Sequence, residues 1–121
     1  MRTKVIDIPL YNYQATIFFK KSRSAVEKWF AKHCEQQPSE EFYDGLFSSN
    51  TALGSTAHEA PFSAVVMHEW NSDSPHLYGV LSHELFHLAE FHFYNVGIPH
   101  SEDTSEAWAY FIGELTRQVY S

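Results

Sequence analysis

The chain has 121 residues, 44% of them hydrophobic and 17% aromatic, which is enough apolar surface for one folded core and too much for a disordered segment. A net charge of −7 with only eight Lys and Arg argues against a nucleic-acid backbone as the main partner, because such binding depends on clustered basic side chains. A single cysteine excludes an internal disulfide. These bounds predict one domain over residues 1–121, and the single cysteine favours a cytoplasmic setting. No membrane partner is expected, since no apolar run approaches the roughly 20 residues of a bilayer span.

The first third of the chain is predicted to form two strands and a helix. Residues 4–12 and 14–21 are rich in β-branched and aromatic side chains, which favour strands, and the polar turn between them allows the two to pair. After Ser22 or Ser24, either of which can cap a helix, apolar residues recur at helical spacing. This helix is expected to end before Pro38.

A long loop, a third strand and a long helix are predicted next. Residues 38–60 are mostly small and polar, which is typical of a loop, and loops of this length tend to be functional or mobile. Residues 61–70 then alternate between two faces and are predicted to be a strand. Asp73 or Ser74, followed by a proline at the first helical position, predicts a helix over residues 75–95.

This long helix carries the HExxH pattern, formed by His83, Glu84 and His87. Side chains four residues apart on a helix differ in direction by about 40°, so both imidazoles can reach one metal ion from the same face. Glu84 projects beside that ion without having to bind it, and can accept a proton from the water that the ion activates. The pattern therefore indicates a catalytic metal site; the alternative is a helix whose histidines lie at the boundary of the core.

The residues after the motif disfavour the metzincin class. Metzincins continue with a glycine three residues after the second histidine and a third histidine three residues later, whereas this chain has Glu90 and Phe93 at those positions. The helix is thus expected to continue, and His92 points about 140° away from His87. Glu90 and His92 are predicted to lie outside the site.

A catalytic zinc ion typically takes three protein ligands, and the third has two candidates. Glu106 follows His87 after eighteen intervening residues, in the first turn of a further predicted helix. Small residues three and seven positions after Glu106 would let this helix approach the first one closely. His100 is the alternative ligand.

The pattern His83-Glu84-x-x-His87, eighteen residues and then Glu106 resembles the gluzincin metallopeptidases, which include the thermolysin-like and aminopeptidase-like zincins. The stretch EAWAY, which begins at Glu106, is similar to a Glu-x-x-Ala-Tyr stretch of small phage and bacterial members. The resemblance covers residues 65–115, less than half of the chain.

The resemblance implies a zinc ion held by His83, His87 and Glu106, with Glu84 as the general base of a metallopeptidase. It implies an α+β, zincin-like domain of about three helices packed on a small mixed sheet of about three strands. A peptide or protein is the implied substrate, and residues 63–70 are implied to form the sheet edge to which an extended substrate adds.

Larger gluzincins have a second lobe that supplies an oxyanion-stabilising side chain, and the resemblance predicts no counterpart of that lobe in these 121 residues. Tyr110, one turn after Glu106, is the candidate for that role, with His100 and Tyr78 as alternatives. The missing lobe also motivates a second hypothesis from another class of protein. In that hypothesis the chain is a catalytically weak or inactive zinc-binding interaction module, associated with a phage or a toxin.

Overall fold

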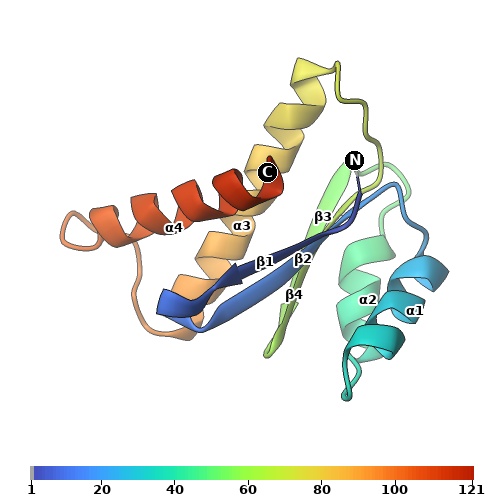
Figure 1. Ribbon diagram of the computed structural model, residues 1–121, viewed down its shortest axis with the longest axis horizontal. Helices are drawn as coiled ribbons and strands as arrows, with labels where there is room; N and C mark the ends of the chain where they lie inside the picture. Colours follow the sequence, from blue (N-terminus) through green and yellow to red (C-terminus); the bar gives the residue numbers. More distant parts are fainter. Residues whose placement is uncertain (1) are drawn as a thin grey trace.

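A four-stranded mixed sheet lies between two pairs of helices in the computed structural model of the protein, which describes residues 2–121 (Figure 1). The strands are β1 (Lys4–Ile8), β2 (Tyr13–Phe19), β3 (Gly54–Glu59) and β4 (Phe62–Met67), with a short 3-10 turn at Pro9–Tyr11. The helices are α1 (Arg23–His33), α2 (Glu40–Phe47), α3 (Pro75–Asn95) and α4 (Ser105–Val119). In the order β1-β2-β4-β3, β2 and β4 are parallel and the other neighbours are antiparallel. The α+β class is as predicted, with four helices and four strands in the described part of the chain instead of about three of each.

The predicted long loop at 38–60 is wrong, because this segment forms α2 and β3. β3 is small and polar and Ala57 is its one buried residue, so no alternation of apolar side chains marks the strand in the sequence. It forms through its backbone ladder with β4, in which Gly54 lies opposite Met67. β3 is one of the two end strands, the other being β1, and β4 has a neighbour on both sides. The sheet edge expected at 63–70 therefore lies at β3.

One face of the sheet is covered by α1 and α2. The Ser22 hydroxyl accepts a hydrogen bond from the Ala25 amide at 3.2 Å, which confirms one of the two predicted caps of α1. Val26 and Phe30 of α1 pack with Phe18 of β2 in a buried cluster. This layer supports the sheet from the face opposite the HExxH helix.

α3 spans Pro75–Asn95, the bounds that the sequence predicts. Ser74 Oγ accepts a hydrogen bond from the Leu77 amide at 3.3 Å, and Pro75 occupies the first helical turn. Beyond the end of the helix, Gly97 has a φ of 76°, a left-handed conformation that favours glycine. Local chemistry at both ends therefore fixes the helix that carries the histidines.

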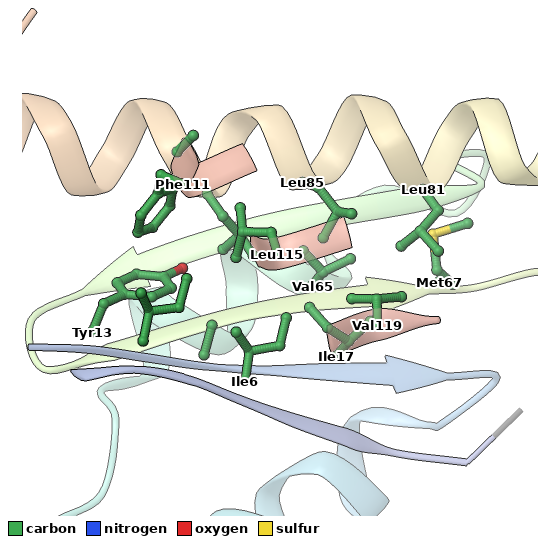
Figure 2. Packing of buried hydrophobic residues seen from close by; sticks show 14 of the residues in the cluster. Ile6, Tyr13, Ile17, Val65, Met67, Leu81, Leu85, Phe111, Leu115 and Val119 are labelled. Atoms are coloured by element: carbon green, nitrogen blue, oxygen red, sulfur yellow. The ribbon is translucent and has the colours of Figure 1, made fainter. Parts of the chain in front are cut away.

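Apolar residues hold α3 against the sheet. Figure 2 shows Leu81 and Leu85 of α3 pointing toward Met67 and Val65 of β4, in a cluster of buried residues. Fully burying a side chain of this size contributes about 1.5–3 kcal/mol. One side of α3 is thus anchored, while the side that carries His83 faces solvent.

α4 covers the same face of the sheet and closes the fold between its first and last elements. Trp108, Phe111 and Val119 are buried along one side of the helix. The Asp7 amide donates to Gln118 Oε1 at 2.9 Å, and Gln118 Nε2 donates to the Asp7 carbonyl at 2.7 Å, which ties α4 to β1. None of the helices in residues 2–121 has both the length and the apolar character that crossing a membrane requires.

Candidate metal centre

The two histidines of the HExxH pattern converge on one point at the solvent-facing side of α3. His83 Nε2 and His87 Nε2 are 3.0 Å apart, and the two rings meet edge to face with their centroids 4.7 Å apart. Two nitrogens bound about 2.0 Å from one tetrahedral zinc ion would stand roughly 3.3 Å apart. Helical spacing alone therefore brings both nitrogens close to the separation that a shared ion needs.

β3 holds the carboxylate of Glu84 beside this pair. Thr56 Oγ1 donates to Glu84 Oε1 at 2.8 Å and lies 3.3 Å from the Glu84 carbonyl oxygen. The second carboxylate oxygen, Oε2, is 3.9 Å from His83 Nε2. Glu84 is 7% exposed, and Gly54 allows the close approach of β3, since a Cβ there would lie 3.0 Å from Glu84 Cγ. Sequence reasoning missed both Thr56 and Gly54, because it placed them in a loop.

Glu90 contacts the site, contrary to the prediction that it lies outside. Its Oε1 accepts a hydrogen bond from His87 Nδ1 at 2.8 Å. The three-residue spacing between the two could have revealed this contact, because residues three apart are neighbours on a helix surface. His92 does lie away from the pair, buried against Tyr13 and Phe111 at ring distances of 5.0 Å and 4.8 Å.

A pocket of about 550 Å³ opens beside the histidines, between the first half of α3 and the start of β3. Its walls are largely small or apolar, and the polar side chains that line it are those of His76, His83 and Glu84. The complete lining consists of Ala52, Leu53, Gly54, Pro75, His76, Gly79, Val80, His83 and Glu84. A ligand in this pocket would thus contact both apolar surface and two of the three HExxH residues, His83 and Glu84.

Glu106 does not join the two histidines. Trp108 is buried with its ring 5.9 Å from that of Phe86 on α3, and Glu106 lies about 160° away from Trp108 around the axis of α4. Glu106 is accordingly exposed. Ala109 and Gly113, expected at the helix contact, also face outward, and a Cβ on Gly113 would meet nothing within 4 Å. Within residues 2–121, no group of three or more His, Cys, Asp or Glu is placed to hold a metal ion.

The candidates for oxyanion stabilisation also lie elsewhere. Tyr110 is half exposed with its ring 6.1 Å from that of Tyr11, which in turn lies 5.8 Å from His92. This is the side of α3 that faces away from His83 and His87. The His100 ring packs 5.4 Å from that of Trp108.

Tyr78, the remaining oxyanion candidate, packs between two aromatic rings. Its ring centroid is 5.0 Å from that of Trp70 and 5.6 Å from that of Tyr120. These contacts hold it on the α4 side of α3, whereas the pocket lies on the β3 side.

No family model, no curated protein and no solved structure matches the chain. What the site can do therefore follows from its geometry.

The donor set fits a metal ion in part. Two imidazole nitrogens converge, and His, with its neutral ring nitrogen, is among the preferred ligands of zinc. The carboxylate of Glu84 stands next to them, tied to Thr56 through one oxygen. The structure brings together His83, Glu84 and His87, adds Glu90, and leaves Glu106 and Tyr110 outside.

Proposed function

We propose that the protein is a zinc-dependent hydrolase of extended peptides, in which His83 and His87 bind the ion and Glu84 is the general base. The observation that carries this proposal is the convergence of the two Nε2 atoms at 3.0 Å, with Glu84 Oε2 at 3.9 Å from one of them. The adjacent pocket gives a substrate access to His83 and Glu84.

Zinc, when bound, activates water for attack and polarises a carbonyl group. Glu84 then moves the proton. Because Thr56 holds Oε1, Oε2 is the oxygen that is free to take a proton from the attacking water and to return it to the leaving amine. Burial of Glu84 between α3 and β3 keeps that oxygen in place through both transfers.

The proposed substrate class rests on β3, the end strand that lies beside Glu84. β3 has β4 on one side only, so its outer edge can pair with an extended peptide by main-chain hydrogen bonds. The start of β3 also forms one wall of the pocket, next to Val80 of α3. A peptide laid along β3 would place an apolar side chain in the pocket and its backbone beside Glu84.

The gluzincin resemblance enters this proposal through the HExxH residues alone. With Glu106 facing solvent, the proposed site has two protein ligands, and its remaining coordination positions are open to solvent and substrate. Such a site binds zinc less tightly than one with three protein ligands, since each ligand contributes to the affinity.

The test combines metal content with hydrolysis. Elemental analysis of the chain loaded with zinc at neutral pH should find one ion per chain, and mass spectrometry should detect cleavage of unstructured peptides. Glu84→Gln should keep the ion and lose cleavage, while Glu35→Gln, a surface change on the opposite layer of the fold, should keep both. A wild-type chain that binds no zinc would refute the proposal.

A second candidate is a zinc-binding interaction module without catalytic activity. The outward orientation of Glu106 favours it, because an open two-histidine site can accept a ligand from another molecule. Exposed Phe86 and Tyr94 lie on the same helix and offer apolar contact surface to such a partner. Zinc binding without any peptide cleavage, in the wild type and in Glu84→Gln alike, would support the module.

A further inference from the structure

We propose that Glu90 is a positioning residue that fixes the proton on His87 and thereby points the lone pair of His87 Nε2 at the metal position. The inference rests on the proposed function, because it concerns the same pair of histidines. It goes beyond the HExxH pattern, which does not include position 90.

The contact between Glu90 and His87 sets the ring's tautomer. Glu90 Oε1 lies 2.8 Å from His87 Nδ1, and an ionised carboxylate can only accept, so Nδ1 carries the proton. In a neutral imidazole the other nitrogen then has the lone pair. His87 Nε2 is therefore the unprotonated nitrogen, and it faces His83 Nε2 at 3.0 Å.

The arrangement assigns the opposite tautomer to His83 in the metal-free protein. Because His87 Nε2 has the lone pair, the short contact between the two rings requires that His83 Nε2 donates its proton to it. A chain of hydrogen bonds thus runs from His83 through His87 to Glu90. The His83 side chain is 68% exposed, so solvent can exchange its protons.

This chain makes the two ligands unequal. His87 is already in the tautomer that binds a metal through Nε2, and it stays so as long as Glu90 is in place. His83 has to transfer its proton from Nε2 to Nδ1, or to solvent, before both nitrogens can bind one ion. Metal binding therefore requires rearrangement at one ring, the more exposed one.

Glu90 is the carboxylate that contacts His87 Nδ1 and can fix its proton. Glu84, the other acid near the pair, has one oxygen tied to Thr56 and is next to His83 Nε2 instead of an Nδ1. The side chain of Glu90 is 31% exposed and that of His87 is 41% exposed. Partial burial strengthens the bond compared with one fully in water.

The first experiment measures the tautomers directly, in the full metal-free chain with ¹⁵N-labelled histidine. Two-bond ¹H–¹⁵N correlation spectra at mildly alkaline pH should show His87 protonated at Nδ1 and His83 at Nε2. In Glu90→Ala, His87 should lose its single tautomer and show averaged nitrogen shifts. An unchanged His87 tautomer in Glu90→Ala would overturn the proposal, even if the wild type binds no zinc.

The second experiment measures zinc affinity by competition with a chromophoric chelator. Glu90→Ala should weaken zinc binding about 10- to 100-fold, the usual effect of losing a carboxylate that orients a histidine ligand. Glu90→Gln keeps an accepting oxygen without the charge and should fall between Glu90→Ala and the wild type. Glu35→Ala, which removes one surface charge far from the site, should bind zinc like the wild type.

The two readouts separate this inference from the proposed function. If the wild-type chain binds zinc and Glu90→Ala binds it equally well, the positioning role is wrong and the hydrolase proposal stands. If the wild type binds no zinc, the hydrolase proposal fails and the tautomer spectra alone decide the role of Glu90.

Discussion

Replacing Gly54 by alanine should destabilise the protein by about 1–2 kcal/mol, although the same change at Gly79 should stabilise it. Both glycines line the pocket beside the HExxH residues. They differ in what a methyl group would meet, so the pair tests whether β3 is packed as tightly on α3 as the structure describes.

The magnitude follows from three contacts. A Cβ on Gly54 would lie 3.0 Å from Glu84 Cγ, 3.1 Å from Met67 Sδ and 3.2 Å from Val80 Cγ1, all shorter than ordinary van der Waals contact. Met67 is fully buried and Glu84 is tied to Thr56, so neither can move freely. Overpacking of this kind costs about 1–3 kcal/mol, and the reduced freedom of the unfolded chain offsets about 0.4–1 kcal/mol of it.

Gly79 is the matched control. It lies within α3, and a Cβ there would meet nothing within 4 Å. Alanine at this position should therefore stabilise the protein by about 0.5–1 kcal/mol, the usual gain for glycine to alanine in a helix.

The measurement is urea unfolding of the metal-free wild type and both variants, followed by tryptophan fluorescence. The midpoint should fall for Gly54→Ala and rise for Gly79→Ala, with similar slopes. A Gly54→Ala protein as stable as the wild type, while Gly79→Ala is stabilised, would refute the tight packing of β3 against Glu84.

Three further predictions follow from the site and its surroundings. Glu106→Gln should leave the zinc affinity unchanged in a calorimetric titration, because Glu106 faces solvent; a large loss would mean that α4 turns its other side to the histidines when zinc binds. Thr56→Val should slow peptide cleavage by up to about 100-fold, because Glu84 loses the hydrogen bond that holds it. Thr56→Ser keeps the hydroxyl and should cleave like the wild type. Equal rates in the two variants would count against the role of the hydroxyl. Acid should destabilise the fold, because burial lowers the pKa of both His58 and His92. As the pH drops below about 6.5, the two histidines take up protons in the unfolded chain before they do so in the folded one. The free energy of unfolding should therefore fall until the folded-state pKa values are passed. A urea midpoint that does not change across this range would contradict the burial of the two rings.

The elements that the sequence predicts well are those whose ends are set by local chemistry. α3 begins at the Ser74 cap and Pro75, and its termination near Gly97 is equally local. Each of these residues acts on backbone groups within one turn, so a single segment contains all the information. The convergence of His83 and His87 is of the same kind, since it depends on four residues of one helix.

The parts that the sequence did not reveal depend on contacts between elements. β3 has one buried residue, Ala57, and is a strand because β4 lies beside it. Glu106 has the spacing expected of a gluzincin ligand, but spacing along a chain does not fix the rotation of a helix about its axis. The buried stripe that includes Trp108 and Phe111 decides that rotation and turns Glu106 outward.

The hydrogen bond between Asp7 and Gln118 is, like the contact of Thr56 with Glu84, a long-range contact of the fold. It joins residues 111 positions apart, and the hydrogen bond from Thr56 to Glu84 joins residues 28 positions apart. Contacts that close long loops form late in folding, because the entropy of loop closure must be overcome before they contribute. His83 and His87, by contrast, come together as soon as one turn of α3 has formed.

If α3 forms early in folding, the proposed site would therefore have its two histidines in place before Thr56 holds Glu84. A zinc ion bound by α3 at that stage would be exposed to solvent. It would stabilise each folding intermediate that contains the formed helix. On the proposed mechanism, hydrolysis would also need the contact between Thr56 and Glu84, so an incompletely folded chain could carry zinc without cleaving the peptides around it.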